Sequence, residues 1–321
     1  ESAAGAPRPR LSGVAPAGSG ARAATVLLVG ARAASRSTGG SHDEQDGPDG
    51  PDGQGRSHHR REQRHRLPGG RGAGHTVYAG ARRVERMQPL RALGVTPVAL
   101  DVTDQDACTG VVETIMAEEG RIDVLVNNAG YGSFGAVEDV DLTEARRQIE
   151  VNVLGLAALT RAVLPHMRAR RSGTVINMSS MGGRFVIFMG GWYHATKYAV
   201  EALSDALRME VADFGIDVVL IEPGAIRTDW GTIAADHLED SARGGAYEKV
   251  ARRVAASMRT LYGSRRLSDP QVVVRAIRRA VEARRPRTRY LIGLGAKPLV
   301  AAHALLPTRL FDRIIRGASA S

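Results

Sequence analysis

The chain has little cysteine, few aromatic residues and no long apolar run. Among its 321 residues the single cysteine is Cys108, so no disulfide framework forms and a reducing, cytoplasmic setting is expected. No stretch approaches the ~20 apolar residues of a membrane span, and we expect no integral membrane segment. The N-terminal residues lack the apolar core of a secretory leader. The chain begins with glutamate, so we expect the natural start to lie upstream.

Positively charged residues are in excess in this sequence. The formal net charge is +10, which is the pattern of a protein that binds nucleic acid or an anionic membrane surface. Aromatic residues make up only 4% of the chain, so there is little to stack on bases. We therefore expect the arginines to lie in solvated tails and on solvated helix faces, and we expect no nucleic-acid partner. An anionic cofactor would also profit from local positive charge.

Apolar runs and amphipathic stretches alternate along most of the chain, which predicts one α/β domain with a doubly wound parallel sheet. Residues 1–23 show no periodicity and are expected to form a disordered tail. The expected strands are residues 24–30, 74–82, 97–101, 122–127, 174–178, 216–222 and 289–293. The expected helices are residues 83–93, 103–119, 141–168, 192–214, 270–283 and 297–316, with a mobile helical flap over 228–265.

The most informative stretch runs from Ser180 to Lys197. Tyr193 and Lys197 are four residues apart, so on a helix both side chains lie on one face. A free tyrosine has a pKa of about 10, and a nearby ammonium favours the phenolate and lowers that pKa. Ser180 follows the apolar run 174–178, which is typical of a buried strand. All three side chains can meet at the carboxyl edge of a parallel sheet.

These residues resemble the short-chain dehydrogenases/reductases. The resemblance rests on the Ser-(x12)-Tyr-x-x-x-Lys spacing, on Asn127-Asn-Ala-Gly130 and on Pro223-Gly224, and it covers about residues 74–295. It implies a Rossmann-like domain over residues 24–295 and a C-terminal helix over 296–321 packed on it. It also implies an oxidoreductase that transfers hydride between a nicotinamide cofactor and an alcohol or ketone, and an assembly of two or four copies.

The resemblance assigns catalytic roles to four residues. Tyr193 takes the place of the general acid and base, and Lys197 would lower the Tyr193 pKa and hold the cofactor ribose. Ser180 would orient the substrate oxygen; Ser179 is the neighbouring candidate, but the thirteen-residue spacing favours Ser180. Asn152 matches the asparagine that supports a water-mediated proton relay. Taken alone, Asn152 would be interpreted as a helix-interior amide satisfied by a neighbouring carbonyl.

Cofactor contacts carry over from the family at the strand ends. Asn128 to Gly130 would run beside the adenosine ribose, and Asp101 and Val102 would flank the adenine. Pro223, Gly224 and Thr228 would lie along the nicotinamide. Taken alone, Pro223-Gly224 is a turn after a strand. The predicted cofactor residues are Gly30, Arg82, Asp101, Val102, Asn128, Ala129, Gly130, Tyr193, Lys197, Pro223, Gly224 and Thr228.

The end of the second strand sets the choice of cofactor. An acidic residue there would accept hydrogen bonds from a ribose 2′-hydroxyl, whereas an arginine would bind a 2′-phosphate. The chain has Ala81-Arg82-Arg83 and no acid, which predicts NADP(H) rather than NAD(H), with Arg82 as the main phosphate ligand. The alternative is that both arginines are solvated residues at a helix start. No metal site is expected, because His58, His59 and His65 have neither the spacing nor the companion ligands of a metal site.

One part of the family pattern is broken. After the first strand the family has Thr-Gly-x-x-x-Gly-x-Gly, whose glycines let the backbone approach the pyrophosphate. Here only Gly30 remains, with Ala34 and Arg36 at the other glycine positions. The segment 31–72 is of low complexity and has too few apolar residues for a core-facing helix. Two hypotheses stay open, a frame-shifted translation of the first crossover helix and a genuine insertion. A protein without this turn could also be a catalytically impaired or non-enzymatic member of the fold.

Apolar side chains close to the predicted catalytic residues favour a bulky apolar alcohol or ketone over a sugar. They are Phe185, Val186, Phe188, Met189, Trp192 and Trp230, of which several are expected to line an apolar pocket and others to pack into the core.

Sequencing the encoding DNA distinguishes the two hypotheses for residues 31–72. If the segment is frame-shifted, another reading frame should spell a helix that opens with Gly-x-x-x-Gly-x-Gly. If neither alternative frame contains such a helix, the segment is an insertion.

Overall fold

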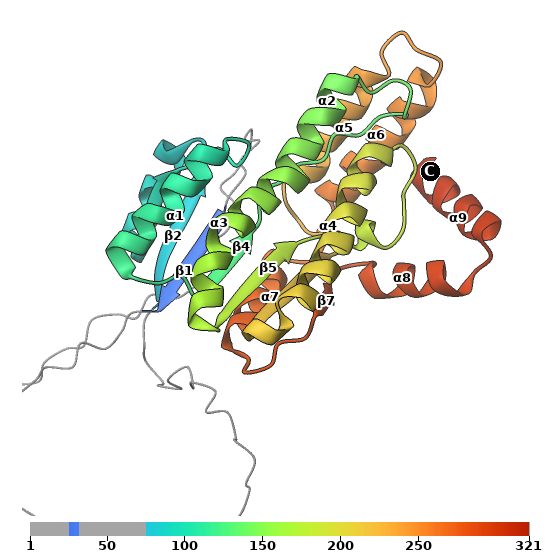
Figure 1. Cartoon of the computed structure of the whole chain (residues 1–321). Helices are drawn as coiled ribbons and strands as arrows, with labels where there is room; N and C mark the ends of the chain where they lie inside the picture. Colours follow the sequence, from blue (N-terminus) through green and yellow to red (C-terminus); the bar gives the residue numbers. More distant parts are fainter. Residues whose placement is uncertain (1–25, 32–74, 321) are drawn as a thin grey trace, which may run out of the picture.

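The computed structural model describes residues 26–31 and 75–320 (Figure 1). Its centre is a seven-stranded sheet in the order β3-β2-β1-β4-β5-β6-β7, with helices on both faces. Every pair of neighbouring strands that does not involve β1 is parallel, which confirms the predicted α/β architecture. The strands are β1 (Val26–Ala31), β2 (His75–Ala81), β3 (Val95–Ala99), β4 (Val124–Asn127), β5 (Gly173–Met178), β6 (Ile216–Pro223) and β7 (Arg289–Ile292).

Strand β1 differs from the prediction in its direction. It pairs antiparallel with both β2 and β4, with Val26 opposite Gly80 and Asn127, and Gly30 opposite Thr76. The expectation that this segment is a parallel strand was therefore wrong. A parallel pair needs a long crossover connection, usually a helix. The sequence that follows β1 carries almost no apolar residues from which such a helix could make a core-facing side.

Each face of the sheet is covered by its own helices, as alternation along the strands requires. On one face Leu125 and Val175 pack with side chains of α1 and α3, and on the other Val126 and Ile176 pack with α7. The helical segments are η2 (Val84–Leu93), α1 (Gln105–Glu119), α2 (Leu142–Ile149), η3 (Glu150–Leu154), α3 (Gly155–Arg170), η4 (Met181–Gly183), α4 (Gly191–Glu210), η5 (Ala212–Phe214), α5 (Trp230–Ser241), α6 (Glu248–Gly263), α7 (Gln271–Glu282), α8 (Ala296–Leu305) and α9 (Thr308–Ala320).

Several predicted helices are present with a different internal form. The helix expected over 141–168 is capped by the Asp141 side chain and contains a π-helical turn, η3, between α2 and α3. The helix expected over 83–93 is 3₁₀, and it includes Pro89, which lacks the N–H of an α-helical hydrogen bond. The single terminal helix expected over 297–316 is divided into α8 and α9, because Leu306 is extended before Pro307. The expected flap forms α5 and α6, which pack on each other. Among the described helices, none is long and apolar enough to cross a membrane.

Hydrogen bonds of the His194 ring hold the segment between β5 and α4 against α4. Its Nδ1 lies 2.7 Å from the carbonyl oxygen of Gly182, and the backbone N–H of Ile187 donates to its Nε2 at 3.0 Å. Because Nε2 accepts a hydrogen bond, the ring is neutral and its proton is on Nδ1. Burial lowers the pKa of His194, while the hydrogen bond to Gly182 opposes that shift. The segment that carries Ser180 is thus tied to the first turn of α4.

Replacing His194 by leucine should change both the stability of the protein and its dependence on pH. The variant leaves the buried carbonyl of Gly182 and the partly buried N–H of Ile187 without partners, which should lower the free energy of unfolding by about 1–3 kcal/mol at neutral pH. The native pKa of His194 is depressed, so its contribution is fully present above the unfolded-state value of about 6.5. It is lost as pH falls below that value towards the native pKa.

Urea unfolding of both proteins at about pH 7.5 and about pH 5.5 measures this difference. Wild type should lose more stability than His194→Leu on acidification. Equal losses would show that His194 is not held neutral by the fold.

Candidate active site

The predicted catalytic residues meet at the carboxyl edge of the sheet. Ser180 lies two residues after β5 and caps η4, where its Oγ accepts the N–H of Gly182 at 3.0 Å. The same hydroxyl is 3.4 Å from the carbonyl oxygen of Pro223, at the end of β6. The hydroxyl of Tyr193, on the first turn of α4, is a hydrogen-bond partner of Ser180. Two strand ends and one helix therefore hold both hydroxyls together.

Lys197 lies one helical turn beyond Tyr193 on the same face of α4. Its Nζ is 5.9 Å from the centroid of the Tyr193 ring and donates to the carbonyl oxygen of Met178 at 2.8 Å. Both side chains are buried. The four-residue spacing thus places the two groups side by side, as the sequence predicted, and β5 provides a backbone acceptor for the lysine.

The pKa of Tyr193 differs from the expectation that Lys197 lowers it. Burial raises the pKa of Tyr193 to about 12, and only the hydrogen bond with Ser180 acts in the opposite direction. The ring lies against Phe134 and Trp230, with centroid distances of 5.5 and 5.1 Å, which keep water away from it. Burial also lowers the pKa of Lys197 to about 8, so near neutral pH its charge is only just retained. For both groups desolvation is the largest influence on the pKa.

Asn152 lies in the π-helical turn η3, where π-turns often mark functional sites. Its amide donates to the carbonyl oxygen of Tyr131 at 2.8 Å and to Thr196 Oγ1 at 3.1 Å, and its Oδ1 accepts the N–H of Tyr131 at 3.0 Å. These bonds match the structural interpretation of Asn152, an amide satisfied by backbone groups. They also fix the strand-end segment after β4 beside α4. The relay role stays a prediction.

Most of the predicted cofactor residues lie at this same edge, because β2, β3, β4 and β6 all point towards it. Arg82 follows β2, Asp101 and Val102 come shortly after β3, and residues 128–130 follow β4. Pro223 ends β6, and Gly224 and Thr228 lie between β6 and α5. Val102 is buried and packs against Gly155, so its side chain belongs to the core.

Gly30 is the exception. Because β1 is antiparallel, Gly30 lies opposite Thr76, at the amino end of β2 and so at the far edge of the sheet. The prediction that it joins the other cofactor residues was wrong for this reason.

The described residues fit one end of a dinucleotide better than the other. At the nicotinamide and ribose end, Lys197 is a buried donor and Tyr193 a buried hydroxyl, close to glycine backbone. A Cβ on Gly130 would lie 3.1 Å from Asn152 Oδ1 and 3.8 Å from Lys197 Nζ, so only glycine leaves this approach open. At the pyrophosphate end, the residues that the structure describes provide no glycine turn at this edge. Nor do they contain a cluster of side chains suited to a metal ion.

Sequence reasoning missed part of the aromatic wall around Tyr193. Phe134 is fully buried and contacts Tyr193 and Trp230, and Tyr262 of α6 stacks on Trp230 at 6.0 Å. Phe134 stands only four residues after the Asn-Asn-Ala-Gly motif, which is the signal that could have pointed to it. Tyr262 had no such signal, because the packing of α6 on α5 brings it there.

The apolar residues predicted to line a pocket fall into different environments. Met189 packs with the aromatic wall, whereas Val186 is exposed. Phe185 is fully buried against Phe311 of α9, so it is one of the residues that pack into the core. A pattern of apolar residues does not specify which element will pack on them.

Comparison with known proteins gives a consistent result. A model of the family described as short chain dehydrogenase matches residues 71–238, just over half of the chain, and begins at the end of the low-complexity segment 31–72. A 3-ketodihydrosphingosine reductase of Bacteroides thetaiotaomicron is 35% identical over 76% of this chain and 88% of its own. An NADPH-dependent 3-dehydrocapnine reductase of Ornithobacterium rhinotracheale is 34% identical over 68% of this chain and 78% of its own.

A crystal structure of a short-chain dehydrogenase from Streptomyces avermitilis is similar in fold as well as in sequence. Its TM-score is 0.60 at 37% identity, and the match covers 70% of this chain and 82% of that one. The extent of these matches, together with the meeting of the serine, tyrosine and lysine at the strand ends, shows that the chain belongs to the short-chain dehydrogenase/reductase family of nicotinamide-dependent oxidoreductases acting on CH–OH and C=O groups.

Proposed function

We propose that this protein is an NADP(H)-dependent oxidoreductase that interconverts a bulky apolar ketone and its alcohol. The observation that carries the proposal is the convergence of Ser180, Tyr193 and Lys197 at the ends of β5 and β6. The nicotinamide cofactor supplies or accepts the hydride. The same family membership is the ground for expecting a cytoplasmic homo-oligomer.

The chain's own residues handle the proton and the substrate oxygen. In reduction, Tyr193 gives its proton to the carbonyl oxygen while the Ser180 hydroxyl holds that oxygen in place. In the reverse direction Tyr193 takes the alcohol proton. Because burial makes the Tyr193 phenolate costly, the nearby Lys197 ammonium has to stabilise it. Asn152 keeps the segment after β4 in register with α4, and would relay protons towards Lys197.

The preference for NADP(H) follows from charge at the end of β2. Arg82 and Arg83 directly follow β2, at the edge of the sheet where Asp101 also lies. No acidic residue occupies the end of this strand. A guanidinium binds a phosphate through charge-assisted hydrogen bonds. The NADPH-dependent relative supports the same choice.

The substrate class follows from the wall around Tyr193. Phe134, Met189 and Trp230 pack in one apolar cluster with Tyr193, and Tyr262 lies against Trp230. A polyhydroxylated substrate would lose hydrogen bonds to water there without replacement. The reductase relative that acts on a 3-keto compound supports a ketone as substrate.

A second candidate is a catalytically impaired or non-enzymatic member of the fold. The observation in its favour is the placement of Gly30 at the far edge of the sheet. Without a phosphate turn, the residues at the nicotinamide end would have no firmly held cofactor.

Cofactor titration separates the two candidates and requires no substrate. NADPH fluorescence with the purified chain should saturate, and NADH should bind more weakly. Arg82→Ala should weaken NADPH binding by about tenfold or more and leave NADH binding nearly unchanged, because a hydrogen bond to a charged group contributes about 1.5–3 kcal/mol.

Arg83→Ala is the matched control and should have the smaller effect on NADPH binding. If folded wild-type protein binds neither cofactor, the second candidate is correct. If NADH and NADPH bind equally well, the assignment of Arg82 as the phosphate ligand is wrong.

Tyr193→Phe should remove catalysis and keep the cofactor site. We expect kcat/KM for NADPH oxidation to fall by about 10²- to 10⁴-fold, because a positioned general acid contributes that much. The assay follows NADPH absorbance with aliphatic ketones of increasing chain length, and hydroxyacetone serves as a polar comparison.

Tyr198→Phe is the control, because Tyr198 lies on the same helix with 42% of its surface exposed. It should retain wild-type kcat/KM. A Tyr193→Phe variant that binds NADPH and reduces ketones at the wild-type rate would refute the proposed role of Tyr193.

A further inference from the structure

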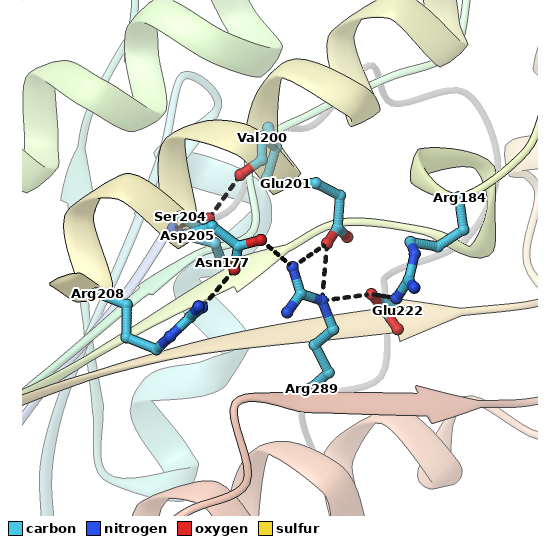
Figure 2. A network of polar contacts seen from close by, with 9 residues as sticks. All are labelled: Asn177, Arg184, Val200, Glu201, Ser204, Asp205, Arg208, Glu222 and Arg289. Atoms are coloured by element: carbon cyan, nitrogen blue, oxygen red, sulfur yellow. Dashed lines mark hydrogen bonds and ion pairs between the residues drawn. The ribbon is translucent and has the colours of Figure 1, made fainter.

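A network of charged side chains lies beside the catalytic residues and connects α4 to β6 and β7 (Figure 2). Arg289, at the start of β7, is its centre. Its guanidinium contacts Glu201 at 3.1 Å, Asp205 at 2.6 Å and Glu222 at 3.2 Å. The outer members are Arg184, which pairs with Glu222 at 3.1 Å, and Arg208, which pairs with Asp205. The family match ends at residue 238, so Arg289 comes from a part of the chain outside it.

Glu201 is the member of this network that faces the catalytic residues. It follows Lys197 by four residues and Tyr193 by eight, so all three side chains share one face of α4. Only 7% of Glu201 is exposed. A Cβ on Gly183 would lie 2.8 Å from Glu201 Cγ, 2.9 Å from Ser179 Oγ and 3.0 Å from the carbonyl oxygen of Lys197. Glu201 therefore packs against the segment that carries Ser180.

The charges of Glu201 and Lys197 depend on each other. Burial lowers the pKa of Lys197 to about 8, and the Glu201 carboxylate opposes that shift. Burial likewise raises the pKa of Glu201 to about 7, opposed by the Ser179 hydroxyl and by Arg289. The charged groups around Glu201 are Lys197 and Asp205 on α4, Glu222 on β6, Arg289 on β7 and Arg184 after η4.

We propose that Glu201, oriented by Arg289, is a positioning residue that keeps Lys197 positively charged beside Tyr193. Glu201 touches neither the substrate nor the cofactor and acts through Lys197. The inference rests on the proposed function, in which the Lys197 ammonium stabilises the phenolate of Tyr193. A buried ammonium without a nearby carboxylate loses its proton more readily.

Arg289 affects the ionisation of Glu201. Glu201 is buried near a second buried carboxylate, Glu222, which makes ionisation of Glu201 harder. Arg289 contacts both, so that Glu201 can be ionised while Glu222 is also present. The last strand of the sheet thereby influences the charge of a lysine on α4.

The three lysines of the chain allow a direct test. They are Lys197, Lys249 and Lys297, so protein labelled with ¹³C-lysine gives three ¹³Cε signals, and Lys197→Arg identifies one of them. In the full chain, the Lys197 signal should titrate with a midpoint of about 8. In Glu201→Gln the midpoint should fall by about one pH unit.

Asp205→Asn is the matched control. It removes the same charge from the same helix, one turn further from Lys197, and should leave the Lys197 midpoint at its wild-type value. A Glu201→Gln midpoint equal to that of wild type would overturn the proposal, and so would equal shifts in the two variants.

Wild-type protein provides a second test that does not depend on whether a variant folds. Because the Glu201 carboxylate acts on Lys197, the Lys197 signal should show a further inflection near pH 7, where Glu201 takes up its proton. A single inflection in folded wild-type protein would also overturn the proposal.

The pH profile of kcat/KM for NADPH with the ketones then distinguishes the proposed role of Glu201 from the proposed catalytic role of Lys197. In Glu201→Gln the alkaline limb should move to lower pH by the same amount as the Lys197 midpoint. If the midpoint moves and the profile does not, Glu201 controls the charge of Lys197, but the proposed catalytic role of Lys197 is wrong.

Discussion

The burial of three ionisable side chains along one face of α4 is the constraint on which much of this structure depends. Tyr193, Lys197 and Glu201 are nearly withdrawn from water, and a buried charge without a partner is costly. The compensating groups come from other elements: the carbonyl oxygen of Met178 at the end of β5, and Arg289 at the start of β7. The site is therefore held as much by the order of the strands as by the helix that carries it.

The aromatic wall explains why the tyrosine needs such support. Phe134 and Trp230 pack against the Tyr193 ring, Tyr262 lies against Trp230, and the resulting exclusion of water from Tyr193 makes the phenolate harder to form. It also strengthens any charge interaction that remains, because the local dielectric constant is low. A phenolate at Tyr193 would therefore depend on a cation close to the ring, and Lys197 Nζ lies 5.9 Å from the ring centroid.

The N-terminal part of the chain stands apart from this organisation. The family match begins at residue 71, and β1, which precedes it, runs antiparallel to its neighbours. From β2 onward the strands run in one direction, and Ser180, Tyr193 and Lys197 meet at their carboxyl ends. The described residues therefore fit the nicotinamide end of a dinucleotide better than its pyrophosphate end.

Local spacing was enough to predict much of this arrangement. A four-residue interval puts Tyr193 and Lys197 on one helical face whatever surrounds them, and parallel strands bring Arg82, Gly130 and Ser180 to one edge. Periodicity identifies a buried face but not the element that will cover it, or the direction in which two strands pair. For that reason only the tertiary structure decided the orientation of β1, the packing of Phe185 under α9 and the contact between Arg289 and Glu201. It also decided the pKa of Tyr193, because desolvation depends on neighbours that lie far away in the sequence.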